Sequence, residues 1–113
     1  MHEIGIAQGA LDLALAAAQK SGATQIHEVK LRVGAMSGVV PDALIFAFES
    51  LRQGTIAATA SLNIETVPAV FWCGQCQAEF AADEWQFECP ACHQFSAELR
   101  RGKELELASL EVS

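Results

Sequence analysis

Lysine and arginine are scarce in this chain of 113 residues, where seven basic side chains stand against fourteen acidic ones and the formal net charge is −7. Affinity for nucleic acid comes largely from clustered basic residues, so this balance argues against binding to phosphate backbones. The same balance disfavours adsorption to an anionic membrane surface. We therefore expect neither nucleic acid nor a membrane as a partner.

Long uninterrupted apolar runs are also missing. The alanine- and leucine-rich residues 7–18 are broken by Asp12, and Glu3 stands where a signal peptide carries positive charge. The run is too short and too broken to cross a bilayer. We expect a cytoplasmic protein, and in a reducing compartment two pairs of cysteines favour a metal site over disulfides.

Two segments have the spacing of amphipathic helices. Residues 4–18 form the first, and the second begins at Pro41, which suits the first turn of a helix, and ends at Gly54. The expected buried stripes are Ile4, Ala7, Leu11, Ala14, Leu15 and Ala18 in the first, and Leu44, Ala47, Phe48 and Leu51 in the second. The apolar side chains of Met36, Phe46 and Phe48 are assigned to the core rather than to function.

Three other segments alternate as half-buried strands do. Residues 27–33 and 62–65 alternate strictly, whereas residues 103–112 change phase partway along. A bulge near Ala108 or Ser109 brings all four apolar residues of the last segment to one face.

The order of these elements predicts an α+β fold: two helices packed on a three-stranded sheet, with an inserted zinc-knuckle lobe held by four cysteines. The last strand is expected to return to the sheet formed by the first two. Residues 1–68 and 98–113 then form one domain, and residues 69–97 form the zinc-binding lobe.

The strongest motif comprises Cys73, Cys76, Cys89 and Cys92, in two Cys-x-x-Cys pairs twelve residues apart. Each short spacer lets two thiolates reach one ion, and two such turns supply the four ligands of a closed, structural zinc site. Disulfides, redox-active dithiols and a rubredoxin-like iron site are the alternatives, and iron is the most serious of them. The lobe has few apolar residues for a core, namely Trp72, Phe80, Trp85 and Phe87, so metal binding is expected to supply much of its folding energy.

The chain begins Met1-His2-Glu3, which brings a terminal amine and an imidazole close together. The backbone nitrogen between them can deprotonate, and such nitrogen ligands suit square-planar nickel(II) or copper(II). The bulk of His2 is expected to prevent removal of Met1, and Glu3 adds an oxygen ligand or an acceptor that orients the imidazole. Taken alone this is a weak signal, because an early histidine is more often a solvated residue.

The sequence resembles the HypA/HybF family of hydrogenase maturation nickel chaperones nearly end to end. Besides the start of the chain and the four cysteines, the resemblance is carried by Ile6-Ala7-Gln8, Leu31-Arg32-Val33-Gly34, Ser37-Gly38-Val39, Pro41, Ala43-Leu44, Phe46-Ala47-Phe48-Glu49, Gly54-Thr55, Leu62, Ile64-Glu65, Pro68, Gly102-Lys103-Glu104-Leu105 and Ser109-Leu110-Glu111-Val112.

The resemblance implies that His2 is the essential nickel ligand, with the Met1 amine, nearby backbone nitrogens and Glu3 completing the site. It implies nickel as cargo and zinc as a structural ion, with no catalysis by the chain itself. The implied partners are a HypB-type GTPase, the large subunit of nickel–iron hydrogenase and, for some members, urease maturation proteins. The chain departs from the family in having His93, where a glycine usually follows the last cysteine.

Two functional classes compete with this interpretation. A zinc-ribbon module that binds protein or nucleic acid shares the cysteine pattern, although the acidic balance opposes nucleic acid. An iron electron carrier shares it too. His93 is expected to be an ordinary surface residue rather than an extra metal ligand, and His27 is assigned no role.

Overall fold

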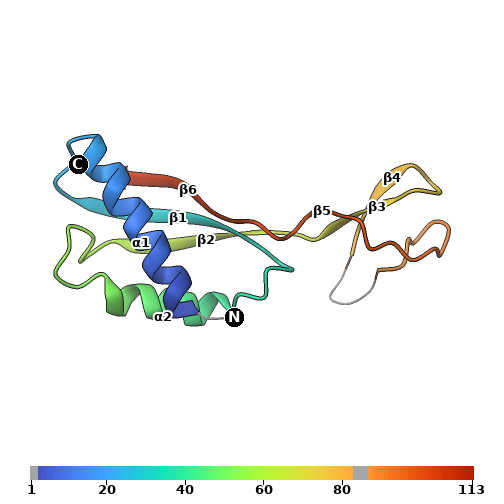
Figure 1. Cartoon of the computed structure of the whole chain (residues 1–113), viewed down its shortest axis with the longest axis horizontal. Coiled ribbons are helices and arrows are strands. Elements are labelled where there is room, and N and C mark those ends of the chain that lie inside the picture. Colours follow the sequence, from blue (N-terminus) through green and yellow to red (C-terminus); the bar gives the residue numbers. More distant parts are fainter. Residues whose placement is uncertain (1–2, 83–86) are drawn as a thin grey trace.

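The structure is a computed structural model and describes residues 3–82 and 87–113. The described part forms an elongated molecule of 54 × 25 × 16 Å, with the cysteine-rich residues at one end (Figure 1). Its elements are α1 (Glu3–Lys20), β1 (Ile26–Gly34), α2 (Pro41–Leu51), β2 (Ser61–Val67), β3 (Val70–Cys73), β4 (Ala78–Ala81), β5 (Leu99–Arg101) and β6 (Leu105–Val112).

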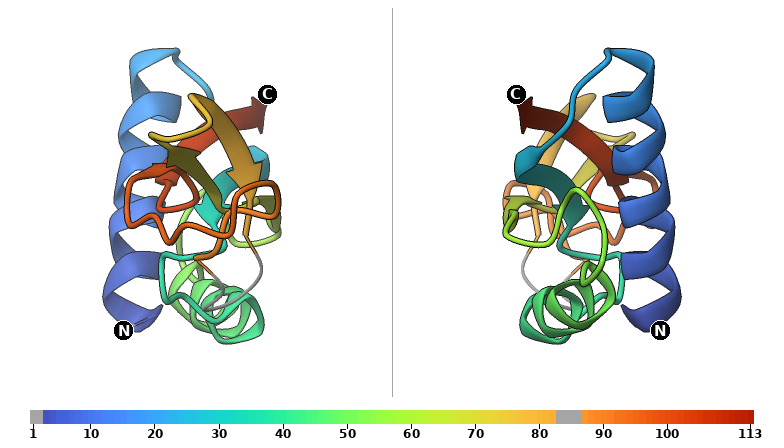
Figure 2. Two further views of the ribbon diagram at one scale, coloured as in Figure 1. Left: turned by 90° about the vertical axis from the view of Figure 1, so that its right-hand side faces the viewer. Right: turned by 90° about the vertical axis from the view of Figure 1, so that its left-hand side faces the viewer.

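The larger sheet has the strand order β2-β1-β6. β1 runs parallel to β2 and antiparallel to β6, which confirms that the last strand returns to the first two. A parallel pair needs a crossover connection, and α2 provides it. Val29, Leu31 and Val33 on β1 are buried in one cluster with residues of both helices, so α1 and α2 cover the same face of the sheet (Figures 1 and 2).

β6 contains the predicted bulge. Lys30 lies opposite Ser109 while Leu31 lies opposite Leu107, so Ala108 is the extra residue. This shift lets Leu107 and Leu110 both pack against the core despite their odd spacing.

The buried stripes of the helices are confirmed except at Ile4, and the separate assignment of Phe46 to the core is wrong. Ile4 is 68% exposed and Phe46 is 75% exposed, so neither belongs to the core. Phe46 precedes the fully buried Phe48 by two residues, which is about 200° around an α-helix and turns the side chain to solvent. Ile4 lies in the first turn of α1, where its side chain and Ala43 of α2 line a groove between the two helices.

A second sheet, with the order β4-β3-β5, forms the cysteine-rich end. β5 lies beyond residue 97, where the inserted lobe was expected to end, and it pairs with β3. The loop after β1 joins the two ends of the molecule: the Met36 N–H donates to the Gly102 carbonyl at 2.7 Å. The side chain of Met36 packs against the buried residues of the second sheet.

Within residues 3–82 and 87–113, neither helix combines the length and the hydropathy needed to span a membrane.

Candidate metal centre

The first cysteine pair lies in the turn between β3 and β4. Cys73 is the last residue of β3 and lies opposite Ala78 in the ladder, so the chain reverses within the four residues between them. The Cys76 N–H lies 3.4 Å from the Cys73 sulfur. Gln77, directly after the pair, has a φ of 52°, in the left-handed region.

The second pair repeats this arrangement. An isolated bridge between Glu88 and Phe95 closes the loop that holds Cys89 and Cys92, and the His93 N–H donates to the Cys89 carbonyl at 2.8 Å. His93 has a φ of 65°. His93 therefore has left-handed backbone, a conformation that favours glycine over a residue with a Cβ. The left-handed backbone of Gln77, at the equivalent position after the first pair, was not predicted. Its place directly after the second cysteine of the same kind of turn is the signal that could have predicted it.

The two turns bring all four thiols together. Their sulfur atoms lie within 4.8 Å of one another, with Cys73 and Cys92 at 3.5 Å and Cys76 and Cys89 at 3.9 Å. Zn–S bonds of about 2.3 Å require sulfur–sulfur distances of roughly 3.8 Å in a tetrahedron, so the donor set fits a four-coordinate ion. A disulfide requires about 2.05 Å, and all four cysteines are free.

Backbone donors and neighbouring thiols shift the acidity of these cysteines in opposite directions. The backbone N–H groups of Cys92 and Ala91 stabilise the Cys89 thiolate and lower its pKa from 9.0 to about 7. Hydrogen bonding to Cys92, followed by desolvation, raises the pKa of Cys76 to about 12. Four crowded thiols do not all ionise by themselves, and a divalent cation supplies the charge that lets them do so.

The core behind this centre is aromatic. Phe71 stacks on Phe80 with ring centroids 5.9 Å apart and meets Phe87 edge-on at 5.1 Å. The prediction that Trp72 belongs to this core is wrong: its ring lies under the Arg100 guanidinium, 4.5 Å from its centroid. Side chains alternate along β3, so Phe71 shares the buried face with Cys73 and Trp72 points the other way. The fourth expected core residue, Trp85, lies outside the described residues.

Of the expected nickel ligands, Met1 and His2 lie outside the described residues. Glu3 opens α1, and its carboxylate accepts a hydrogen bond of 3.4 Å from the N–H of Val40. Val40 is the residue before α2 and has no capping hydrogen bond from its own side chain. Glu3 thus provides an acceptor at the positive end of α2.

The two remaining histidines each contact one polar side chain. His93 is exposed and its Nδ1 lies 3.1 Å from the Glu88 carboxylate, and it is not part of the thiol cluster. His27 Nε2 lies 2.8 Å from the hydroxyl of Ser113.

Comparison with known proteins identifies relatives along the whole chain. The model of a family described as "Hydrogenase/urease nickel incorporation, metallochaperone, hypA" matches residues 1–112. The hydrogenase maturation factor HypA of Picosynechococcus sp. is 47% identical over 112 residues, and the alignment covers 99% of each chain. The HypA proteins of Chloroflexus aurantiacus and Rhizobium leguminosarum bv. viciae are 43% and 36% identical, with the same coverage.

Solved structures agree with the sequence relatives. The solution structure of the Ni metallochaperone HypA from Helicobacter pylori superposes with a TM-score of 0.71 at 26% identity, covering 99% of this chain and 97% of the other. A second solution structure of a HypA protein gives 0.74, also at 26% identity, covering 100% and 97%. The chain shares the fold of these proteins and carries a four-thiol cluster, and it belongs to the HypA family of hydrogenase/urease nickel-incorporation metallochaperones.

Proposed function

We propose that this chain binds nickel(II) at its N-terminus and delivers it to the large subunit of nickel–iron hydrogenase during maturation. The ligands are the Met1 amine, the His2 imidazole and the backbone nitrogen between them, with Glu3 close by. The observation that carries the proposal is the match of the family model from residue 1 to residue 112, which includes this start of the chain.

The surroundings of Glu3 support this assignment. Its hydrogen bond to the Val40 N–H connects the first turn of α1 to the start of α2, so the position of Glu3 itself is defined. Ligands at a chain start can be replaced one at a time by a competing partner, which suits a protein that must release its metal.

We assign zinc to the four cysteines as a structural ion. Four thiolates complete a tetrahedral shell and leave no position for water or substrate, and their softness favours zinc over calcium or magnesium. We propose residues 1–68 and 98–113 as the nickel-binding part and residues 69–97 as the zinc lobe, with β5 of the first part completing the sheet of the second.

The proposed cellular setting follows from the family. We propose that a HypB-type GTPase and the hydrogenase large subunit are the partners, that urease maturation proteins are further candidates, and that the protein works in the cytoplasm. The chain is proposed to act as a carrier and not as an enzyme.

Nickel titration of the untagged protein and of His2→Ala, with zinc measured in both, tests the proposal. We expect the variant to lose nickel binding and to keep its zinc. Nickel uptake by the variant equal to that of the parent would contradict the proposed ligand set. A variant with one residue added before Met1 serves as a second test, since moving the free amine is expected to impair nickel binding while leaving His2 in place.

The pH dependence provides an independent test. Nickel must displace protons from an amine with a pKa of roughly 7.7–8.0 and an imidazole with a pKa of roughly 6.5. We therefore expect nickel affinity to fall between pH 8 and pH 6. Equal affinity at the two pH values would exclude these ligands.

A further inference from the structure

β6 is an edge strand of the larger sheet in the part of the chain that the structure describes. It pairs with β1 on one side, and no other described strand pairs with its second side, which leaves that row of backbone groups available. An extended peptide can add to such an edge, where backbone hydrogen bonds give affinity and side-chain contacts give specificity.

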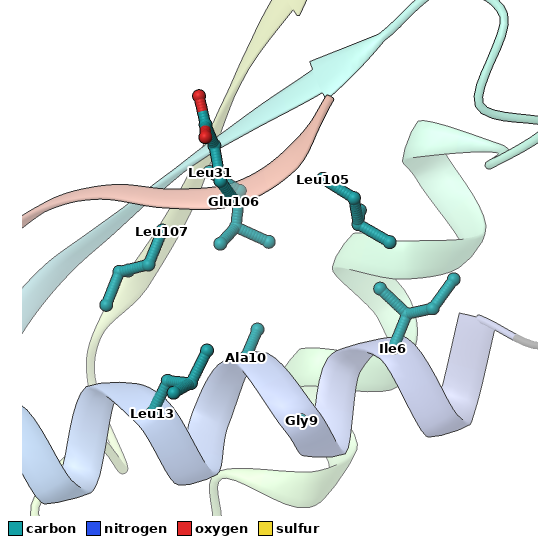
Figure 3. A pocket seen from close by; sticks show the side chains of 8 residues that line it. All are labelled: Ile6, Gly9, Ala10, Leu13, Leu31, Leu105, Glu106 and Leu107. Carbon is teal, nitrogen blue, oxygen red and sulfur yellow. The ribbon is translucent and has the colours of Figure 1, made fainter. Parts of the chain in front are cut away.

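An apolar groove lies beside this edge, between β6 and α1. Its volume is about 380 Å³, and it is lined by Ile6, Ala10 and Leu13 of α1 and by Leu105 and Leu107 of β6. Figure 3 shows the leucines of β6 and the apolar side chains of α1 on opposite walls of this groove. Leu13 is 60% exposed and Leu105 is 43% exposed, so the groove offers uncovered apolar surface to an added strand.

The opposite face of the sheet carries a ladder of alternating charge. Arg32 on β1 lies between two carboxylates, 3.7 Å from Glu65 on β2 and 2.9 Å from Glu106 on β6. Figure 3 shows the Glu106 carboxylate on the side of the strand away from α1. A strand added next to β6 would continue the alternation by placing a lysine or arginine beside Glu106.

Farther along β6, the register brings two carboxylates opposite each other. Glu111 lies opposite Glu28 on β1, so neither carboxylate gains a cation from its cross-strand partner. A second basic side chain on the added strand would relieve this like-charge pair.

A second copy of this chain is a poor match for the same edge. The residues of β6 on the charged face are Glu106, Ser109 and Glu111, so pairing β6 with itself brings carboxylates together without a cation.

We propose that β6 binds an extended segment of a partner protein that alternates apolar and basic residues. The apolar side chains enter the groove between α1 and β6, and the lysine or arginine side chains face Glu106 and Glu111. Among the described residues, neither the four cysteines nor Glu3 line the groove or lie on β6, so the proposal is argued without either metal site.

A synthetic peptide tests this proposal directly. The probe is a blocked, fluorescent eight-residue peptide, the length of β6, in which lysine and valine alternate. Binding to the full-length, zinc-loaded protein is measured by fluorescence anisotropy, and amide hydrogen exchange identifies the protected strand. We expect protection of β6 at Leu105–Leu107, and at least tenfold weaker binding of a peptide with the same residues arranged as a lysine block and a valine block.

Charge reversal on the two edge strands, β6 and β2, distinguishes binding at β6 from general attraction of a basic peptide to an acidic protein. Glu106→Lys is expected to weaken binding by about tenfold or more, because an attraction becomes a repulsion. Glu65→Lys is the matched control, since it makes the same charge change beside the same arginine but at the β2 edge, and it should change the affinity by less than about twofold. Equal effects of the two variants would overturn the proposal.

The groove is tested in the same way. Leu13→Ala is expected to weaken binding several-fold, whereas Ile4→Ala removes another exposed apolar side chain of α1 outside the groove and should have no effect. A glutamate–valine peptide should bind the double variant Glu106→Lys/Glu111→Lys better than it binds the parent. Protection at β2 instead of β6, or dimerisation of the free protein through β6, would overturn the assignment of the occupant.

Discussion

Gly34 and Gly102 meet where the two ends of the molecule join, and they leave no room for a side chain: a Cβ atom on Gly34 would lie 2.1 Å from the carbonyl carbon of Gly102. The same region is held by hydrogen bonds from the Gly34 N–H to the Glu104 carbonyl and from the Ala35 N–H to the Val67 carbonyl, at 2.7 and 2.8 Å. The chain segments that connect the larger sheet to the cysteine lobe are therefore packed backbone against backbone.

Gly34→Ala is expected to destabilise the protein by about 2–3 kcal/mol, because the new methyl group cannot fit without moving the backbone of residues 102–103. Denaturant unfolding measures the change. Gly9→Ala is the control, because a Cβ there meets nothing within 4 Å and alanine favours the helix by up to about 1 kcal/mol. Equal stability of Gly34→Ala and the parent would contradict the close approach.

Metal removal is expected to weaken the cysteine lobe selectively. Both tryptophans of the chain, Trp72 and Trp85, belong to this part of the sequence, so tryptophan fluorescence reports on it, whereas far-UV circular dichroism reports mainly on α1 and α2. After chelation we expect the fluorescence transition to move down by about 10 °C or more, since a structural ion contributes folding free energy. If the circular dichroism transition falls by the same amount, the cysteine lobe and the part that contains α1 and α2 do not unfold separately.

The acidity of Cys89 predicts a change in the pH dependence of metal binding near pH 7. Its pKa is held at about 7 in the folded lobe, so above this value it is already a thiolate and below it a proton must leave when the ion binds. Zinc affinity should therefore lose about one extra factor of ten per pH unit below pH 7. Competition titrations with a chelator at low temperature, at pH 6, 7 and 8, measure this. An unchanged slope across that range would refute the role given to the amides of Ala91 and Cys92.

The depressed pKa of Cys89 also predicts how the stability of the metal-free lobe changes with pH. A folded-state value of about 7 against 9.0 contributes stability that is fully present above pH 9 and is lost as the pH falls through 7. The metal-free lobe is thus expected to melt at a lower temperature at pH 6.5 than at pH 8.5. No difference in tryptophan-detected melting between these two pH values would argue against a stabilised thiolate.

His93→Gly is expected to stabilise the cysteine lobe by up to about 1 kcal/mol. The φ of 65° is strained for a residue with a Cβ, and glycine adopts it without that cost. Gln77→Gly, at the equivalent place after the first pair, is expected to act in the same direction. Melting of the zinc-loaded variants followed by tryptophan fluorescence checks both. A lower melting temperature for His93→Gly would show that its contact with Glu88 outweighs the backbone strain.

Short-range patterns in the sequence were sufficient for several features of this protein. Alternation placed Val29, Leu31 and Val33 on one buried face, and the change of phase after Leu107 predicted a bulge near Ala108 or Ser109, which the register places at Ala108. The two Cys-x-x-Cys turns were equally readable, because the spacing that brings two thiols to one point depends only on a few adjacent residues.

Other features depend on which surface of an element the rest of the chain covers. Ile4 has the spacing of a core residue, and only the placement of α1 in the fold leaves it exposed. Phe46 and Trp72 are different, because helical spacing from Phe48 and alternation with Phe71 and Cys73 already turn them away from the buried faces.

The sequence by itself determined the order of the two helices and of the three strands of the larger sheet, and the two Cys-x-x-Cys turns, because each depends on residues close together in the chain. The strands β3, β4 and β5 of the cysteine-rich end were not predicted. Only the tertiary structure decided how Gly34 approaches Gly102, how Met36 reaches the aromatic core, and how Arg32 comes to lie between Glu65 and Glu106. These contacts join residues far apart in sequence, and they exist only once the strands are in register and the two sheets have met.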